Sequence, residues 1–161
     1  MRLAILADTH LPRGARRLPE ACLRELEAAD LIIHLGDFNE LAVLRHLESL
    51  GPVEAVRGNV DSPQLRRLLP AHKEIEVDDV RLALIHDAGP ARGRMARMRR
   101  RFPEADAVLF GHSHLPLLEG DGEFQLFNPG SPTERRRAET RSMGRGEITE
   151  GRLALRHVLL S

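Results

Sequence analysis

The sequence predicts an α/β fold in which two packed β-sheets carry helices on their outer faces. The early part of the chain alternates short apolar runs with amphipathic stretches, a pattern typical of parallel βαβ units. The later part consists mostly of short apolar runs between turn residues, so we expect antiparallel hairpins to extend the sheets. A polar residue able to bind a metal follows five of the runs, and ligand sites of open α/β sheets lie at the carboxyl ends of strands.

The elements of the first half follow from the spacing of the apolar residues. Cys22, Leu23 and Leu26 recur at helical spacing with charged residues between them. Pro19 suits the first turn of that helix, and Gly51-Pro52 ends the next one. The predicted elements are strands at residues 3–7, 31–35 and 53–56, and helices at residues 19–29, 40–50 and 63–69.

The second half contains more strands than helices. Asp78-Asp79, residues 119–122 and Glu150-Gly151 lie between pairs of apolar runs and predict three hairpin turns. A third long helix is expected from Gly89-Pro90 to about Arg101, and the Asn-Pro-Gly-Ser-Pro stretch at residues 128–132 predicts a rigid loop. The predicted strands are residues 74–77, 80–85, 107–110, 115–118, 123–127, 146–149 and 152–160.

The composition predicts one domain and does not favour nucleic acid as a partner. A chain of 161 residues with 42% apolar content suits a single domain over residues 1–161. The 24 basic residues balance the 24 acidic ones, so the chain has no net field for binding polyanions. Trp and Tyr are absent, so a base-stacking surface for nucleic acid is not expected. A homo-oligomer is left open by these observations.

The single cysteine and the short apolar runs predict a cytoplasmic protein. Cys22 excludes an internal disulfide and fits a reducing compartment. It lies in an expected helix, where a small buried apolar residue is a simpler interpretation than a reactive thiol. No apolar run approaches the ~18 residues that span a membrane. Residues 3–7 are too few for the apolar core of a signal peptide.

Two histidines lie in the turn Gly111-His112-Ser113-His114, directly after the apolar residues 107–110. Alternate residues of an extended chain point the same way, so both imidazoles can project into one pocket as metal ligands. Taken alone, such a turn is more often a pair of surface histidines. The other strand ends favour metal binding, because Asp, His or Asn follows each of them. The seven candidate ligands are Asp8, His10, Asp37, Asn59, His86, His112 and His114.

Seven ligands exceed the four that one tetrahedral zinc ion takes, and they suit two divalent ions that share a carboxylate. Two carboxylates and a bridging hydroxide leave such a pair of ions with positive charge, so the site would attract an anionic substrate. The mixture of oxygen and imidazole donors suits Mn²⁺, Fe²⁺, Co²⁺, Ni²⁺ and Zn²⁺. We take manganese as the first candidate.

These motifs resemble the calcineurin-like metallophosphoesterases, whose signature is Asp-x-His, Gly-Asp, Gly-Asn-His-Asp/Glu, a later His, and Gly-His-x-His. The resemblance extends from residue 8 to about residue 137. The length is similar to that of the small single-domain bacterial and archaeal phosphodiesterases, and Asn128-Pro129-Gly130-Ser131 resembles a loop of that subgroup. The matching stretches are Asp8-Thr9-His10, Gly36-Asp37, Gly58-Asn59-Val60-Asp61, His86 and Gly111-His112-Ser113-His114.

The resemblance implies an αββα sandwich of two mixed β-sheets with a dinuclear metal site at one edge. It also implies a metal-dependent phosphodiesterase in which a metal-bridging hydroxide attacks phosphorus in line. The implied ligands are Asp8, His10, Asp37 and His114 for one ion, and Asp37, Asn59, His86 and His112 for the other.

Two positions depart from the family pattern. Val60 stands where the family often has a histidine, which is thought to act as a general acid or to hold the phosphate. The small subgroup commonly lacks this histidine too, so its loss does not indicate inactivity. Asp87 stands where glycine usually follows the ligand His86, and an acid there could contact His86 or perturb the site.

Three further residues have both a functional and a structural interpretation. Arg57 precedes Asn59 and could clamp a phosphate, and a surface ion pair explains it equally well. Asp61 could orient an imidazole ligand, or it could cap the helix that starts at Pro63. His34 lies within an apolar run and is interpreted as a core histidine or as support for a ligand.

The remaining histidines and the arginine runs have weaker indications. His46, His72 and His157 lack a motif context and are interpreted as surface residues. The basic run at residues 94–101 is expected to form a solvated helix face. The run at residues 135–137 follows the rigid loop closely enough to reach a substrate.

We therefore expect a dinuclear metal-dependent phosphodiesterase that acts on a small phosphoester, with Asp37, Asn59, Asp61 and Arg57 serving catalysis. One alternative is a non-catalytic interaction scaffold, because the retromer scaffold subunit resembles this family but lacks part of the ligand set. All seven ligands are present here, which favours catalysis. Nucleotide or dinucleoside-polyphosphate hydrolysis ranks lower, because Trp and Tyr are absent as stacking partners for a base.

Overall fold

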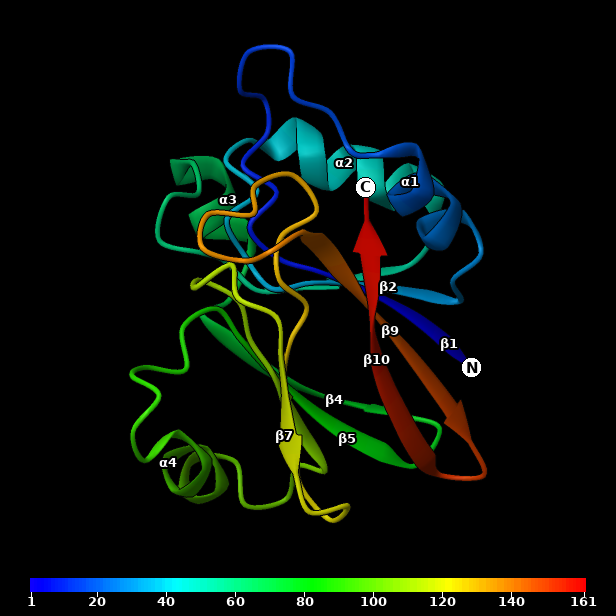
Figure 1. Cartoon of the computed structure of the whole chain (residues 1–161), viewed down its shortest axis with the longest axis vertical. Coiled ribbons are helices and arrows are strands. Elements are labelled where there is room, and N and C mark those ends of the chain that lie inside the picture. The colour runs from blue at the N-terminus through cyan, green and yellow to red at the C-terminus, as the bar shows by residue number, and fades with distance from the viewer.

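The computed structural model describes residues 1–161 and contains two five-stranded β-sheets (Figure 1). The strands are β1 (Arg2–Leu6), β2 (Leu31–His34), β3 (Val53–Ala55), β4 (His72–Val77), β5 (Val80–Ile85), β6 (Ala107–Leu109), β7 (Leu117–Gly120), β8 (Gln125–Asn128), β9 (Arg141–Thr149) and β10 (Arg152–Leu160). The helices are α1 (Glu20–Glu27), α2 (Leu41–Leu50), α3 (Pro63–Leu68) and α4 (Arg94–Arg101).

The first sheet has the strand order β10-β9-β1-β2-β3. Its strands β1, β2 and β3 are parallel, with Leu3 opposite Leu31 and Ile32 opposite Val53. The β9–β10 hairpin adds to β1 in antiparallel fashion. Parallel βαβ units extended by a hairpin were the arrangement that the sequence predicted.

The second sheet has the strand order β4-β5-β6-β8-β7. Strands β5, β6 and β8 are parallel, and the hairpins β4–β5 and β7–β8 form its two edges. Asp78 and Asp79 make the first hairpin turn with φ of 47° and 64°, a backbone region that Asp tolerates better than most residues. The predicted α/β class, with two mixed sheets and outer helices, is confirmed.

The main core lies between the two sheets. Leu3 and Ile5 of β1 belong to one buried cluster with Leu82 of β5 and Phe127 of β8. Burying side chains of this size stabilises the fold by roughly 1.5–3 kcal/mol each. Gly144 of β9 permits this packing, because a Cβ atom there would lie 2.4 Å from Cε1 of Phe127.

Helices cover both outer faces of the sandwich (Figure 1). Cys22 of α1 and Leu47 of α2 pack in a second cluster against the first sheet, and Met98 of α4 packs in a third against the second sheet. Burial raises the pKa of the Cys22 thiol to about 12, so this cysteine is an inert packing residue as predicted. None of the helices has the length and apolar character needed to cross a membrane.

The third long helix starts later than the sequence indicated. It begins at Arg94 and not at Gly89-Pro90. Gly89 and Gly93 have left-handed backbones, with φ of 77° and 71°, which a right-handed helix cannot include. The Arg97 guanidinium donates to the Pro90 carbonyl and holds the loop before the helix. The prediction was wrong because a Gly-Pro pair also forms turns.

The strand β9 begins earlier than the sequence indicated, at Arg141 in place of residue 146. Gly144 and Gly146 interrupt the alternation of apolar and polar residues by which a strand is recognised in the sequence. In the structure they pair with Ile5 and Leu3 of β1. A Cβ atom at Gly146 would lie 3.0 Å from Cδ1 of Leu3, so glycine keeps the neighbouring side chain in place. Glycine in a strand often marks such a close approach.

One partly buried carboxylate joins α1 to the first sheet. Glu25 accepts hydrogen bonds from Arg2 Nη2 at 2.8 Å and from Arg145 Nε at 2.8 Å, and Arg145 Nη2 donates to its other oxygen. Burial would raise the pKa of Glu25, but the hydrogen bonds and charges of Arg145 and Arg2 outweigh it and lower that pKa. The ionised carboxylate therefore links α1 to β1 and β9.

We expect Glu25→Gln to lower the free energy of unfolding by about 1–2 kcal/mol at neutral pH, because charge-assisted hydrogen bonds are weakened. The folded-state pKa is lowered, so this stabilisation is present above the unfolded pKa of ~4.3 and is lost as pH falls through the folded value. The difference in urea unfolding between Glu25→Gln and the wild type should shrink as the pH falls below ~4.3. The control is Glu20→Gln, which alters an exposed pair with Arg24; an equal loss there would contradict the assignment.

Candidate metal centre

Seven polar side chains meet where β1, β2, β3, β5 and β6 end. Each belongs to the loop that follows one of these strands. The loops come from distant parts of the chain, and parallel strands bring their carboxyl ends to the same edge. The structure thus brings together all the residues that the sequence predicted as ligands: Asp8, His10, Asp37, Asn59, His86, His112 and His114.

The first group of candidate ligands is Asp8, His10 and His114, whose ligand atoms lie within 4.8 Å of one another. The Nε2 atoms of His10 and His114 are 3.2 Å apart. Nε2 of His114 is also 3.6 Å from Oδ1 of Asp8. All three residues are buried, so the group forms the floor of the site.

The second group is Asp8, Asp37 and His86. Nε2 of His86 lies 3.3 Å from Oδ2 of Asp37 and 3.0 Å from Oδ1 of Asn59. The Asn59 oxygen is also 3.1 Å from Nδ1 of His112. Asp8, Asp37 and His86 are buried, whereas Asn59 and His112 next to them are exposed and form the open side of the site.

The carboxylate of Asp8 is the strongest structural indication of a cation. Both of its oxygens are buried and neither has a hydrogen-bond partner. Burial raises the pKa of Asp8 to about 7, which measures how poorly the protein alone stabilises this charge. Buried charges in proteins are paired or bind metals. Carboxylate and imidazole donors suit first-row divalent ions, so the residues fit a metal site.

Burial and nearby charges also shift the pKa values of the neighbouring side chains. Burial opposes the ionisation of Asp37, but the hydrogen bond and charge of His86 outweigh it and place the Asp37 pKa at about 2. Burial also opposes protonation of His86, but the contact with Asp37 outweighs it and raises that pKa. Burial lowers the pKa of His114 to about 4, so its ring is neutral and can act as a ligand.

Five of the seven candidates have a left-handed backbone. L-amino acids rarely adopt this region, and such conformations cost on the order of 1–3 kcal/mol each. Backbone strain of this kind clusters at functional sites, where surrounding contacts maintain it. The φ values are 56° for Asp8, 45° for His10, 61° for Asp37, 70° for His112 and 61° for His114.

Asp61 holds two of the ligand loops together. Its carboxylate accepts hydrogen bonds from the backbone N–H groups of Asp37 at 3.2 Å, Asn39 at 3.0 Å and Gly58 at 2.7 Å. It does not contact an imidazole, and the cap of α3 is Ser62, whose hydroxyl accepts from the Leu65 N–H. Both sequence interpretations of Asp61 are corrected: it orders the backbone on either side of the site.

The buried side chain of His34 contacts two of the ligand loops and holds them together. Its Nδ1 accepts from the Gly36 N–H at 3.2 Å, and its Nε2 lies 3.0 Å from Oγ1 of Thr9. The ring stacks on Phe38 with centroids 3.5 Å apart. Burial lowers the pKa of His34 to about 3, which keeps the ring neutral between the two loops. This agrees with the expected core histidine that supports a ligand.

The last residue of β8 and the rigid loop that follows it hold the two remaining ligand segments in place. Asn128 Nδ2 donates to the Gly111 carbonyl at 2.9 Å and contacts Oγ of Ser113 at 3.2 Å. The hydroxyl of Ser131 donates to the Asp8 carbonyl at 2.8 Å. The loop therefore holds the His-x-His turn against the end of β1.

Arg57, which the sequence assigned to catalysis, does not turn toward the cluster. Its Nη1 donates to the carbonyls of Arg66 at 2.9 Å and Leu69 at 3.4 Å, at the end of α3. Carbonyls at a helix C-terminus lack helical partners and attract arginine. The structure shows neither a phosphate clamp nor the alternative surface ion pair.

Asp87 contacts a different ligand from the one expected. Its Oδ1 accepts from the Gly89 N–H at 2.7 Å, and its Oδ2 lies 3.9 Å from Nε2 of His112. His157 is also corrected, because it is partly buried, stacks on Phe127 and lies 2.8 Å from the Asn128 carbonyl.

His46 and His72 are exposed, as the sequence indicated. Arg99, Arg100 and Arg101 of α4 are exposed, as expected for a solvated helix face. Arg94 and Arg97 are partly buried, and Arg94 lies over the ring of Phe110.

Two residues near the ligands escaped the sequence reasoning. Asn39 Oδ1 lies 3.1 Å from Nδ1 of His10, and the Glu134 carbonyl accepts from Nδ1 of His114 at 3.1 Å. Contacts to the second ring nitrogen orient a histidine ligand. Asn39 could have been inferred from its place two residues after Asp37. Glu134 carries no local signal, because its role depends on a loop packed from elsewhere in the chain.

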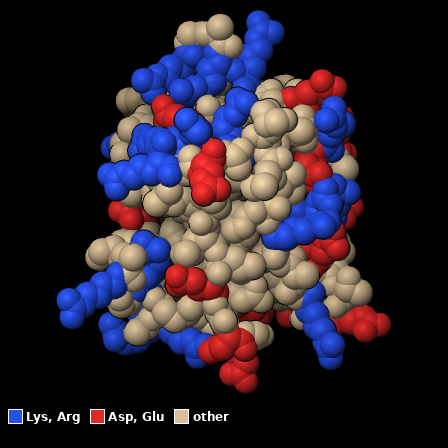
Figure 2. Space-filling view, viewed as in Figure 1, with Lys and Arg blue, Asp and Glu red and all other residues tan.

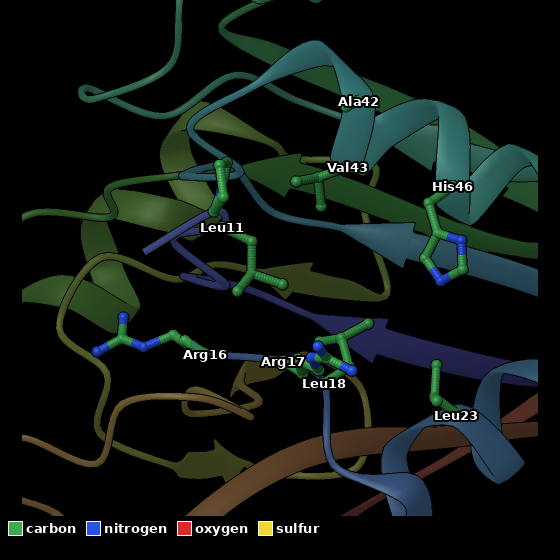
Figure 3. Close-up of a pocket in the computed structure, with 9 residues that line it drawn as sticks. Leu11, Arg16, Arg17, Leu18, Leu23, Ala42, Val43 and His46 are labelled. Atoms are coloured by element: carbon green, nitrogen blue, oxygen red, sulfur yellow. The ribbon is translucent and has the colours of Figure 1, made fainter. Parts of the chain in front are cut away.

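An apolar pocket of about 420 Å³ lies beside the cluster, between segment 11–18 and the helices α1 and α2 (Figure 3). Leu11, Leu18, Leu23 and Val43 line it. None of the seven candidate ligands contributes to the pocket, so the polar chemistry lies outside it.

The sandwich and its cluster of aspartates and histidines define a metal-binding α/β domain. The calcineurin-like phosphoesterase superfamily model matches residues 1–151, and the chain belongs to this superfamily. A probable metallophosphoesterase of Methanothermobacter thermautotrophicus is 36% identical over 135 residues, which cover 83% of this chain and 78% of that protein. A phosphodiesterase of Methanocaldococcus jannaschii is 25% identical over 144 residues, which cover 81% and 83%.

A solved structure confirms the likeness of the fold. Wild-type Vps29 of Entamoeba histolytica, complexed with Zn²⁺, has a TM-score of 0.78 to this protein. The two sequences are 20% identical, and the match covers 99% of each chain. At this identity the comparison supports the arrangement of the sheets and helices.

Gly58 gives a test of the site geometry. A Cβ atom there would lie 2.0 Å from Oδ1 and 2.3 Å from the backbone N of Asp37, so we expect Gly58→Ala to displace Asp37. Calorimetric titration with Mn²⁺ should show affinity weakened at least roughly tenfold. The control is Gly51→Ala, where φ is 168° and no atom lies within 4 Å. Unchanged affinity in a folded Gly58→Ala protein would contradict the assigned geometry.

Proposed function

We propose that this protein is a metal-dependent phosphodiesterase that binds two divalent cations at the cluster of seven candidate ligands. The buried carboxylate of Asp8 is the main observation in favour, because it belongs to both groups of ligands and has no hydrogen-bond partner in the protein. Membership of the superfamily and the curated phosphodiesterase relative support the activity. Seven donors also exceed the need of one tetrahedral ion.

The residues divide into a floor and an open side. Oδ2 of Asp37 lies 3.7 Å from Nε2 of His10 and 3.3 Å from Nε2 of His86. Its carboxylate can therefore bind a cation on either side, as the carboxylate of Asp8 can. The cations, when bound, supply positive charge for the phosphoryl oxygens and activate a water for in-line attack. The exposed Asn59 and His112 mark the side from which a small phosphoester reaches the cluster.

The metal and the compartment are part of the same proposal. Manganese is the first candidate, followed by iron, nickel, cobalt and zinc, all of which suit mixed oxygen and imidazole donors. The single buried Cys22 supports a reducing, cytoplasmic environment.

The alternative is an interaction scaffold on the same fold. The likeness to Vps29 is the observation in its favour. Against it, the candidate ligand set is complete, and several hydrogen bonds orient it. Absence of turnover on any phosphoester with any divalent metal would favour the scaffold.

We expect Asp37→Asn to reduce phosphodiester hydrolysis by at least about 100-fold, because the change removes a charged donor that lies between His10 and His86 and can serve both proposed cation positions. Elemental analysis of the reconstituted wild type should approach two metal ions per chain. Asp79→Asn, in the β4–β5 turn, makes the same chemical change away from the cluster and should retain activity. Near-wild-type turnover by Asp37→Asn, or full activity with one ion, would contradict the dinuclear proposal.

Val60 predicts a strong dependence of rate on the leaving group. Its side chain is 48% exposed and cannot donate a proton, whereas a positioned acid contributes roughly 10²–10⁴-fold. We therefore expect aryl esters to be cleaved far faster than alkyl esters. Val60→His should flatten this dependence, and Val60→Phe, which adds a ring without a proton, should not. Equal slopes for wild type and a fully metallated Val60→His would exclude this position for the acid.

A further inference from the structure

Three arginines gather around one carboxylate next to the ligand cluster. Arg13 Nη1 lies 3.0 Å and Arg16 Nη2 lies 3.2 Å from Oε1 of Glu134. Arg136 Nε lies 3.4 Å from Oε2 of the same carboxylate. That second oxygen is also 3.6 Å from Nδ1 of His114, a candidate ligand. We call Arg13, Arg16 and Arg136 the arginine rim.

The rim belongs to a surface with an excess of positive charge. Segments 11–18 and 131–140 together hold six arginines and two glutamates, although the formal net charge of the chain is zero. Figure 2 shows Lys and Arg side chains gathered over the upper part of this face, where Figure 1 places these two segments. One carboxylate cannot neutralise three guanidinium groups, so positive charge is left beside the cluster.

Most N–H donors of the rim have no partner in the protein. A guanidinium offers five donors. The Arg13 and Arg136 side chains are 65% and 51% exposed, and Glu134 is the group with which they pair. Arg16 extends away from the apolar residues of the pocket (Figure 3), and its buried Nη1 has no hydrogen-bond partner. If the three arginines served only to link the two loops, we would expect more of their N–H groups to be paired with acceptors within the protein.

The rim is connected to the ligands through the chain and through Glu134. Segment 11–18 starts directly after the candidate ligand His10. Glu134 pairs with all three arginines, and its backbone carbonyl accepts from Nδ1 of His114 at 3.1 Å.

We propose that the arginine rim is a second anion subsite, which binds a further phosphate group of a phosphoester whose reacting phosphate lies at the ligand cluster. The inference rests on the proposed function and narrows its substrate class to molecules with two phosphate groups. Planar guanidinium groups bind phosphate through paired N–H donors, and the exposed Arg13 and Arg136 have such donors available.

The test compares two probes that differ by one phosphate. Calorimetric titration of the manganese-loaded chain with thymidine 5′-phosphate and thymidine 3′,5′-bisphosphate cancels any contribution of sugar and base. We expect the bisphosphate to bind roughly tenfold more tightly at low ionic strength. The ratio of affinities should fall toward one in Arg13→Gln and Arg136→Gln. Arg137→Gln, which removes an exposed arginine of the same run, should keep the ratio.

Two results would overturn the subsite. The first is equal affinity of the wild type for the two probes, or no binding of either. The second is an equal fall of the ratio in Arg137→Gln, because general surface charge would then explain the binding. Hydrolysis of the 4-nitrophenyl ester of thymidine 5′-phosphate tests the proposed function separately. Its absence would contradict the phosphodiesterase, while the affinity ratio would still decide the subsite.

Discussion

The buried carboxylate of Asp8 is the constraint on which the rest of the site depends. It has no exposed surface and no hydrogen-bond partner, yet it lies at the end of the central strand of the first sheet. A charge in that position is costly unless a cation or protonated group balances it. His86, whose raised pKa favours the protonated ring, lies 4.0 Å from Asp8, and the surrounding candidate ligands fit a divalent cation. The position of the histidines next to Asp8 is therefore explained by the burial of this carboxylate as well as by their role as candidate metal ligands.

The surrounding hydrogen bonds make this arrangement possible. Five candidate ligands have left-handed backbones, and nothing in their own sequences stabilises that conformation. Asp61, His34 and Ser131 each bind backbone or hydroxyl groups of a ligand loop from outside the cluster. Their contacts compensate the backbone strain and hold the imidazole and carboxylate groups at fixed separations. The site is thus maintained by residues that do not themselves need to bind a metal.

Because its residues differ in burial, the site has a closed side and an open side. Asp8 and His114 are closed off inside the molecule, whereas Asn59 and His112 lie at the surface. The open side of the cluster is therefore the side of Asn59 and His112. The arginines around Glu134 lie on the Nδ1 side of His114, where the Glu134 carboxylate is 3.6 Å from this nitrogen. The loop after β1 thus carries two candidate ligands, Asp8 and His10, together with Arg13 and Arg16, whereas the loop of Glu134 and Arg136 carries none.

The sequence by itself determined the order of strands and helices and the seven candidate ligands. Both are local properties: apolar periodicity marks a strand, and the polar residue at its end marks the site. Tertiary structure alone decided how Arg57, Asp61 and Glu134 are used. Arg57 binds carbonyls at the end of α3, and Glu134 reaches His114 across a separate loop. The direction of a long or loop-borne side chain depends on which acceptors folding brings near it, and no local pattern encodes that choice.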